Sequence, residues 1–517
     1  MTTHDSSRPT ARISTGVVRG VVVDGDVRTW RGIPFGAPTS GARRFCKPEP
    51  ASPWSEELDC SEYGAPAPQP TYSWNDKVLG SEDCLNLDVV RPHTDDRLPV
   101  VVYFHGGSFV IGSSFEPVLR GHNLVRSMDV VYVSVNFRLG VLGYLDMRTQ
   151  GDDCVATPAL HDQLLALQWV AENIEAFGGD PGNVTIMGES AGAAAVASLM
   201  ACPPANGLFH RAVAQSPPLA QVHSRAQSHM WTKRLLQRLG LPAHASLQEL
   251  RDVELASLVR AGQSMMWRGG ELWHLNSCFA PTVDGEMLVS HPLTTFDRGD
   301  QAQVPLIIGT NADEASFGKF IYQRTSRRTR AAQRFLNAYD PNGSQEVLDA
   351  YDGAVTREEF ADLLADAMFW GPTIRAAEEH AAHNDTWMYR FDYAPQALRV
   401  LGLGAMHTVE LSAVFADPHS SRSGSIAKLG GMQGYDEVVE HMQSHWAHFF
   451  HHGTPLDTWP TYSVGEKGRR ETMIFDTQSS VIDDPKPAKR QAWGQFHMTS
   501  WGLGRPELTA ELGVSAL

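Results

Sequence analysis

Strand-like segments that end in glycine alternate along this chain with segments of helical periodicity. Two segments are typical of buried strands, "LPVVVYFHGG" at 98–107 and "DVVYVSVNFRLG" at 129–140. Between Leu160 and Phe177, apolar residues recur at intervals of three and four, which indicates one face of an amphipathic helix. Strands that alternate with helices form parallel sheets covered on both faces. The sequence therefore predicts an α/β fold with a large, mostly parallel central sheet and helices on both faces.

The second half of the chain continues the same alternation with longer insertions. Strands are expected at "RAVAQS" (211–216), "VPLIIGTN" (304–311) and "TWMYRFDY" (386–393), separated by helical and irregular stretches. No Pro/Gly/Ser-rich linker separates these stretches from the rest. We therefore predict a single domain over residues 12–500 with helical excursions over the active site, preceded by a disordered N-terminal tail over residues 1–11.

Composition excludes several classes of partner. The 517 residues carry 43 basic and 59 acidic side chains, so the net charge of −16 disfavours nucleic acid and anionic membrane surfaces. No run of about eighteen apolar residues indicates a membrane-spanning helix. The N-terminus lacks the apolar segment of a secretion signal, and six scattered cysteines without C-x-x-C spacing are typical of reduced thiols. These features predict a cytoplasmic protein and leave its oligomeric state open.

One serine stands between two glycines in "GESAGAAAV", which runs from Gly188 to Val196. A strand-like segment, "NVTIMGES", precedes the motif and a small-residue helical segment follows it. This context is that of a nucleophile elbow, a sharp strand-to-helix turn that exposes a reactive serine, here Ser190. Close packing of a helix against a strand would explain the same glycines without chemistry, and motif composition alone does not separate the two explanations.

A serine nucleophile needs N–H donors for the negative charge that develops on the carbonyl oxygen of its substrate. The segment "FHGGSF" places Gly106 and Gly107 at the end of a predicted strand, where backbone without side chains can approach a substrate. With the N–H of Ala191 they would form a three-donor oxyanion hole. A glycine-rich turn without function is the alternative.

With these motifs the chain resembles the type-B carboxylesterases, the α/β-hydrolase family that includes the cholinesterases and bacterial para-nitrobenzyl esterases. The resemblance extends from about Thr15 to about Pro485 and follows the family's order of motifs. It rests on ordered segments that include "TGVVRG", "RGIPFGAP", "SEDCLNLDV", "YFHGGSF", "NFRLGVLGYL", "FGGDPGNVTIMGESAGA", "VPLIIGTNADEASF" and "GAMHTVEL".

The resemblance implies the remaining catalytic residues. The family's acid falls on Glu314 in "GTNADEASF" and its base on His407 in "GAMHTVEL", in the chain order Ser190, Glu314, His407 expected of the fold. Asp313 is the local rival of Glu314. Two further positions match supporting family residues: Glu189 adds negative potential beside the serine, and Ser216 supports the acid.

Three residues depart from the family pattern near the site. Ala315 and Thr408 stand where glycine is usual, beside the acid and the base, and Pro217 replaces a glycine near the active-site wall. None of them removes a catalytic atom. These departures are expected to affect the range of substrates.

The family's disulfide near the substrate gorge is incomplete in this sequence. Cys84 matches one of its cysteines, but Ala67 stands at the partner position. We therefore expect a free Cys84 and an untied, more mobile loop around residues 71–80. The resemblance also implies an ion pair between Arg44 and Glu82 at the base of this loop.

No metal or cofactor is expected. His441 and His445 have the spacing of two ligands on one helical face but lack the glutamate of H-E-x-x-H, and His380 with His383 offers no better pattern. Glycine-rich segments here do not form a dinucleotide- or nucleotide-binding motif.

Together these patterns predict a serine carboxylesterase that hydrolyses small carboxylic esters through an acyl-enzyme, with activity rising as His407 loses its proton near pH 6.5. The same machinery could cleave carbamates or amides. A more remote alternative is a non-catalytic, cholinesterase-like binding protein, which would be expected to have lost the triad.

Overall fold

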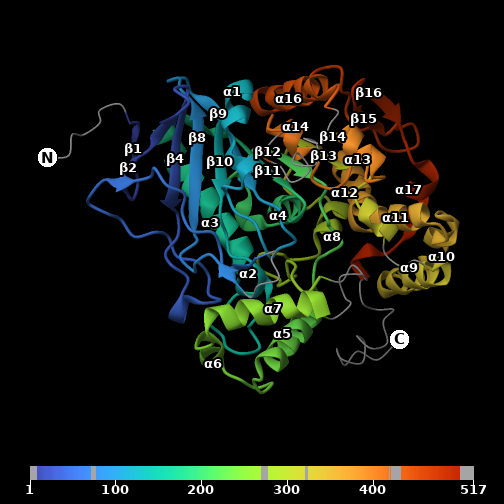
Figure 1. Ribbon diagram of the computed structural model, residues 1–517, viewed down its shortest axis with the longest axis horizontal. Coiled ribbons are helices and arrows are strands. Elements are labelled where there is room, and N and C mark those ends of the chain that lie inside the picture. Colours follow the sequence, from blue (N-terminus) through green and yellow to red (C-terminus); the bar gives the residue numbers. More distant parts are fainter. Residues whose placement is uncertain are drawn as a thin grey trace.

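The computed structural model describes residues 8–71, 77–268, 277–320, 324–418, 420 and 432–500. Its centre is an eleven-stranded sheet of order β16-β15-β14-β13-β12-β11-β9-β10-β8-β4-β3 (Figure 1). All neighbouring strands from β15 to β10 are parallel, and antiparallel strands extend both edges. The predicted α/β fold with a mostly parallel sheet is therefore confirmed. Its strands are β3 (Val21–Val23), β4 (Val27–Pro34), β8 (Asn86–Pro92), β9 (Leu98–Phe104), β10 (Val131–Val135), β11 (Gly179–Glu189), β12 (Arg211–Gln215), β13 (Leu306–Asn311), β14 (Thr386–Phe391), β15 (Glu471–Phe475) and β16 (Ser480–Asp483).

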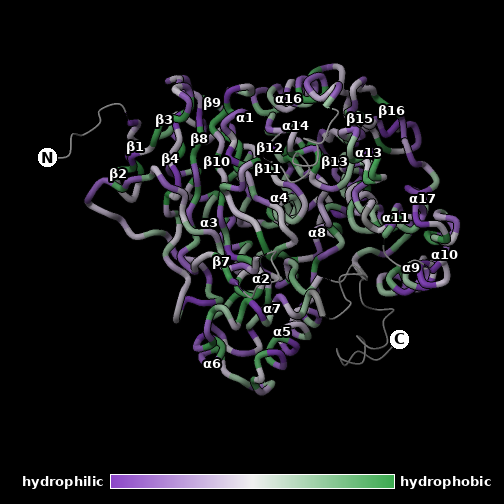
Figure 2. Tube along the Cα trace, viewed as in Figure 1, coloured by the Kyte–Doolittle hydropathy of each residue, from purple (hydrophilic) through white to green (hydrophobic). Residues whose placement is uncertain are grey.

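The central strands are apolar along their whole length because both faces of the sheet are covered. Every residue of β9 and β10 is buried. Along β9, Val100 and Val102 point into one apolar core, whereas Val101 and Tyr103 point into the other. Figure 2 shows hydrophobic residues along these strands and hydrophilic ones on outer helices such as α6 (Leu247–Arg251).

Two groups of helices cover the two faces. Residues of α3 (Pro158–Asn173) and α4 (Ala191–Met200) belong to the larger core, which also includes residues of α2 (Gly140–Tyr144). The second core is formed with α1 (His122–Met128) and α16 (Tyr435–His452), and with the short α14 (Leu411–Val414). The α3 segment is the one expected from helical periodicity, and α4 is the small-residue helix expected after the serine motif.

The expected helical excursions leave the sheet at two points, after β12 and after β13. In Figure 1 the first three helices of the first group lie together below the sheet, and the second group lies beside its β14–β16 edge. The helices of the first group are α5 (Arg225–Leu239), α6, α7 (Leu255–Arg268) and α8 (Pro292–Asp297), those of the second are α9 (Thr325–Tyr339), α10 (Ser344–Asp349), α11 (Arg357–Ala365) and α12 (Gly371–Ala381), and α13 (Gln396–Val400) and α17 (Pro487–Gln495) follow later.

The predicted disordered tail over residues 1–11 is wrong at its C-terminal end. β1 (Thr10–Ile13) forms a small sheet with β2 (Gly16–Arg19) and β5 (Leu58–Asp59). Ala11 and Ile13 are buried, and the guanidinium of Arg8 donates a hydrogen bond of 2.7 Å to the carbonyl of Gly20. The alternating apolar residues of β1 thus find a partner strand that local composition does not reveal. Residues 1–7 of the predicted tail lie outside the described residues.

Cys84 is a free, fully buried thiol, as predicted, and Ala67 is buried as well. The loop expected to be mobile falls partly on residues 72–76, which lie outside the described residues. Its two ends are paired by the short strands β6 (Gln69–Pro70) and β7 (Val78–Leu79). The predicted pair is also present: Arg44 and Glu82 form a buried, two-pronged contact with both distances at 2.7 Å.

Among the residues that the structure describes, no helix has the length and apolar character needed to cross a bilayer.

A second buried ion pair, between Arg138 and Asp162, ties the loop after β10 to α3. Its side chains are 1% and 0% exposed, and the shortest N–O distance is 2.6 Å. Breaking such a pair leaves an uncompensated charge in the core. We expect Asp162→Asn to lower the free energy of unfolding by about 3 kcal/mol in chemical denaturation. The control is Glu175→Gln, which removes an exposed pair with Arg97 and should change stability little; equal effects of both changes would contradict this prediction.

Candidate active site

Ser190 occupies the turn between β11 and α4. Its backbone has φ 55° and ψ −124°, a conformation that L-residues rarely adopt. A Cβ at Gly188 would lie 2.5 Å from the backbone of Gly192, and one at Gly192 would lie 1.9 Å from the carbonyl oxygen of Phe104. Both glycines are therefore required by close backbone approach, and they allow α4 to begin directly against the end of β9.

The structure brings the three residues of the predicted triad together from distant parts of the chain. His407 lies in the segment between α13 and α14, and its Nε2 is 2.9 Å from the Oγ of Ser190. Its Nδ1 is 2.6 Å from the Oε2 of Glu314, which follows β13. The imidazole thus bridges a hydroxyl on one side and a buried carboxylate on the other.

The carboxylate of Glu314 is oriented through its second oxygen. Oε1 accepts hydrogen bonds from the hydroxyl of Ser216 and, at 2.8 Å, from the backbone N–H of Asn311. The rival Asp313 instead accepts a hydrogen bond of 3.0 Å from the backbone N–H of Ala405. The structure therefore places Glu314 next to His407, and Ser216 next to Glu314.

Two of the predicted oxyanion residues, Gly106 and Ala191, lie next to Ser190. A Cβ at Gly106 would be 3.2 Å from the Cβ of Ser190. Gly107 has φ +118°, and a Cβ there would lie 2.0 Å from the carbonyl oxygen of Ile111. Ala191 is the first residue of α4, so its N–H has no acceptor within the helix. Gly106 and Ala191 therefore lie beside Ser190, and Gly107 follows Gly106 in the chain.

Two more glutamates lie close to the imidazole. The Oε1 of Glu189 is 3.2 Å from the Nε2 of His407, and the carboxylate of Glu410 accepts a hydrogen bond from the side-chain amide of Asn311. Both side chains are buried. Sequence analysis missed Glu410, although it lies three residues after His407 in the "GAMHTVEL" segment. Burial and the neighbouring carboxylates raise the pKa of Glu189 and of Glu410.

These carboxylates change the expected pH behaviour. Burial lowers the pKa of His407, but the negative charges of Glu189 and Glu314, the hydrogen bond to Glu314 and the charge of Glu410 outweigh it and raise the pKa to about 9. The expected value of about 6.5, taken from an isolated imidazole, is therefore too low. A buried carboxylate stabilises the imidazolium because little water screens the interaction.

The departures from the family pattern have different structural effects. Thr408 adopts φ 74°, so a β-branched residue occupies a conformation that favours glycine. Ala315 is fully buried but is not in this region of backbone space. The hydroxyl of Ser216, immediately before Pro217, still reaches Glu314. Only Thr408 thus carries local backbone strain among the three.

Two of the four histidines considered as metal ligands have packing roles. His445 is buried with its ring edge-on to Trp459 and Phe475, and His380 bonds the side chain of Gln301 and the carbonyl of Val304. In the part of the chain that the structure describes, no group of three or more His, Cys, Asp or Glu side chains is arranged to hold a metal ion.

Comparison with known proteins identifies the family. The model of the carboxylesterase family matches residues 7–493 of the chain. This chain belongs to the carboxylesterase family. The carboxylesterase is 33% identical over 503 residues to the para-nitrobenzyl esterase of Bacillus subtilis, covering 92% of this chain and 96% of that protein. It is 30% identical to the phenmedipham hydrolase of Pseudarthrobacter oxydans, over 89% and 94% of the two chains.

Solved structures agree with this assignment. One structure of a PNB esterase matches the carboxylesterase with a TM-score of 0.85 and 32% identity, covering 94% of this chain and 99% of that chain. The Geobacillus stearothermophilus carboxylesterase EST55 matches with a TM-score of 0.81 and 30% identity over the same shares. Family and fold together make this protein a carboxylic-ester hydrolase of type B.

The carboxylate cluster predicts a specific pH effect of Glu189→Gln. Removing this charge takes away part of the stabilisation of the imidazolium, so the pKa of His407 falls and the neutral base forms at lower pH. We expect the acidic limb of the kcat/KM profile to move down by about one pH unit. Glu175→Gln, which removes an exposed carboxylate, is the control; a limb that stays in place in Glu189→Gln would contradict the electrostatic assignment.

The conformation of Thr408 predicts that Thr408→Gly stabilises the protein. Relief of the strained φ should exceed the entropy that glycine adds to the unfolded chain, for a gain of about 0.5–1 kcal/mol. Thr408→Ala keeps a Cβ at the same φ and should gain much less. Thermal unfolding of both variants measures the difference, and a loss of stability in the glycine variant would show that strain is not dominant.

Proposed function

We propose that the protein hydrolyses carboxylic esters through a covalent acyl-enzyme on Ser190. The hydroxyl of Ser190 transfers its proton to Nε2 of His407 while its oxygen attacks the ester carbonyl carbon. The N–H groups of Gly106, Gly107 and Ala191 stabilise the oxyanion of the tetrahedral intermediate. When the intermediate collapses, the C–O bond to the alcohol breaks and His407 returns its proton to the leaving oxygen.

Water then completes the cycle by the same route. His407 takes a proton from a water molecule, whose oxygen attacks the acyl carbonyl, and Ser190 leaves with the proton that His407 returns. Glu314 orients the imidazole and stabilises its charged form in both halves of the reaction. Ser216 holds Glu314, and Glu189 adds negative charge beside the imidazolium.

A single observation carries this proposal: the continuous chain of contacts from Ser190 through His407 to Glu314, at 2.9 and 2.6 Å. A binding protein of this fold would not need to keep that chain, which disfavours the non-catalytic alternative. The substrate is a small uncharged or cationic ester rather than a polyanion, since the protein carries a net charge of −16. Cys46, Cys60, Cys84, Cys154 and Cys202 are free thiols, which supports a reducing, cytoplasmic location.

The direct test is hydrolysis of para-nitrophenyl acetate, butyrate and octanoate by the wild type and by Ser190→Ala. We expect a burst followed by steady turnover in the wild type, and a fall in kcat of roughly 10⁴-fold or more in the variant. Ser198→Ala, a buried serine farther along α4, is the matched control and should keep its activity. Equal turnover by Ser190→Ala and the wild type would assign hydrolysis to another residue.

Carbamate hydrolysis is a second candidate, favoured by the similarity to a relative named for a carbamate substrate, phenmedipham. The same attack would leave a carbamoyl group on Ser190, which water removes more slowly because its nitrogen donates electrons to the carbonyl. Incubation with an aryl carbamate should then give an adduct on the peptide that contains Ser190, detected by mass spectrometry, and activity that returns with time. An adduct that never leaves would identify carbamates as inhibitors rather than substrates. Amide hydrolysis is tested in parallel with an anilide.

A further inference from the structure

The helix that leads into α12 is interrupted by a turn of π-helix over Asp366–Trp370. The N–H of Gly371 donates to the carbonyl of Asp366, five residues earlier, instead of four. Pro372 follows, and its ring removes the N–H that an α-helical bond would need. Because one residue is inserted into the turn, the side chains before the proline are rotated relative to a regular helix.

This π-turn places Phe369 against His407. The two rings are stacked, with centroids 4.4 Å apart and planes inclined by 27°, and Phe369 is only 4% exposed. The ring edge of His407 is occupied by Ser190 and Glu314, which bind its two nitrogens. Phe369 therefore covers a face of the imidazole. That face has no hydrogen-bonding group, so packing is what can hold it.

The π-turn itself is anchored from outside the site. The buried carboxylate of Asp366 accepts hydrogen bonds from the hydroxyl of Tyr351 at 2.6 Å and from the ammonium of Lys486 at 3.0 Å. The same ammonium lies 5.0 Å above the ring of Trp370, next to Phe369 in the chain. Contacts on both sides of Phe369 thus hold the turn in one position.

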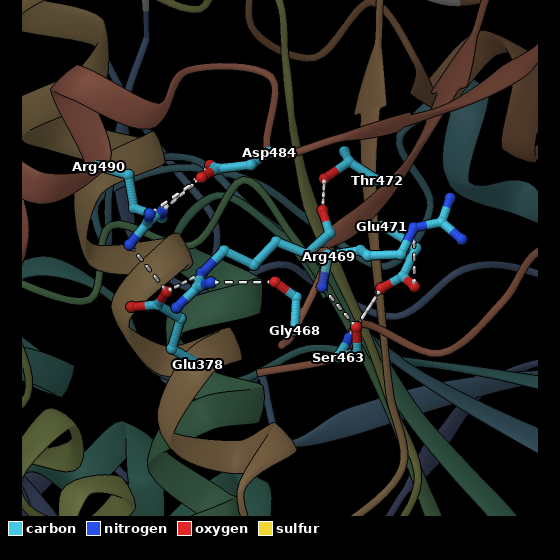
Figure 3. A network of polar contacts seen from close by, with 9 residues as sticks. Glu378, Ser463, Gly468, Arg469, Glu471, Thr472, Asp484 and Arg490 are labelled. Carbon is cyan, nitrogen blue, oxygen red and sulfur yellow. Dashed lines mark hydrogen bonds and ion pairs between the residues drawn. The ribbon is translucent and has the colours of Figure 1, made fainter. Parts of the chain in front are cut away.

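The helix that follows the π-turn is held by ion pairs as well. Glu378 of α12 accepts from Arg470 at 2.7 Å and contacts Arg490 at 3.4 Å, and Arg490 also binds Asp484 (Figure 3). This network joins α12 to α17 and to the β15–β16 hairpin. The helix that continues from the π-turn is therefore anchored to elements outside the proposed triad.

The groups that face the imidazole divide into charges at its edge and an aromatic face. Glu314 and Glu189 lie at its nitrogens, and Glu410 lies nearby on the N-terminal side of α14. Asp366, the acidic residue of the π-turn, is instead occupied by Tyr351 and Lys486. An aromatic face attracts a cation, so stacking favours the imidazolium as well as limiting rotation of the ring.

We propose that Phe369 is a positioning residue for His407, which keeps the imidazole plane aligned between Ser190 and Glu314 and stabilises its protonated form. This inference rests on the proposed function, in which His407 is the base. It also assigns the π-turn a role in the reaction. The turn places the ring of Phe369 against one face of His407. In a regular helix, a different side chain would occupy that position.

The test compares Phe369→Leu, which keeps apolar volume but removes the aromatic face, with Phe369→Tyr, which keeps the ring. In para-nitrophenyl butyrate hydrolysis, we expect Phe369→Leu to lower kcat roughly tenfold with little change in KM, because alignment is lost after substrate has bound. The acidic limb of its kcat/KM profile should move down by about half a pH unit to one, because the imidazolium loses its aromatic partner. Phe369→Tyr should restore both values to within about twofold of the wild type.

Phe335→Leu is the matched control, a buried phenylalanine of α9, and should leave the pH profile in place. Circular dichroism checks the fold of each variant, and Phe369→Met replaces Phe369→Leu if the latter does not fold. An unchanged pH limb and kcat in a folded Phe369→Leu or Phe369→Met protein would overturn the proposal, as would equal losses in the tyrosine variant.

A measurement without turnover separates this proposal from the proposed function. The titration of His407 is followed by NMR of ¹⁵N-labelled histidine in the Ser190→Ala background, with His407→Gln for assignment. A lower pKa in Phe369→Leu than in its parent supports the stacking role even if the substrate class is wrong. An unchanged pKa overturns that role even if the wild type is an active esterase.

Discussion

The close approach of α4 to the end of β9 is the constraint on which the site depends. Gly192 leaves no room for a methyl group against the carbonyl of Phe104, so the helix begins within contact distance of the neighbouring strand. At this contact Ser190 adopts its unusual backbone conformation, and its Oγ lies 2.9 Å from Nε2 of His407. Gly106, in the segment that continues from β9, also approaches Ser190 closely. The site is thus a product of parallel strands that end at one edge, packed against a helix with almost no side chain at its start.

Around this framework the structure concentrates negative charge on one imidazole. Glu314, Glu189 and Glu410 come from three different segments and are all buried. Such a cluster is costly unless it is hydrogen-bonded or neutralised, and here Ser216, Asn311 and His407 serve that purpose. The negative charges of this cluster favour a positively charged His407. They raise its pKa by more than burial lowers it. In the proposed mechanism, the cluster stabilises the imidazolium that forms during ester attack, and a higher pH is required for the neutral base.

The parts of the molecule that sequence reasoning could predict are those whose signals are local. The glycines at 106, 107, 188 and 192 indicate close backbone approach and therefore the strand-to-helix turn at Ser190. The central strands are indicated by their apolar composition. Glu314 and His407 became candidates only through the resemblance to a family, because one acid among 59 and one histidine among 21 have no distinctive spacing. The predicted boundary of the N-terminal tail is wrong because β1 is short and is ordered by its pairing with β2, an interaction that local composition does not reveal.

The sequence by itself determined the fold class and the position of the serine turn, because each depends on residue type or on neighbours along the chain. Its resemblance to a family added the expectation of a free Cys84. Only the tertiary structure decided which carboxylates surround His407, how far they raise its pKa, and that Phe369 covers its ring. Those properties arise where residues separated by tens or hundreds of positions meet in a buried space. There, distance and the loss of water set the energy of a charge, and neither quantity is written in the order of the residues.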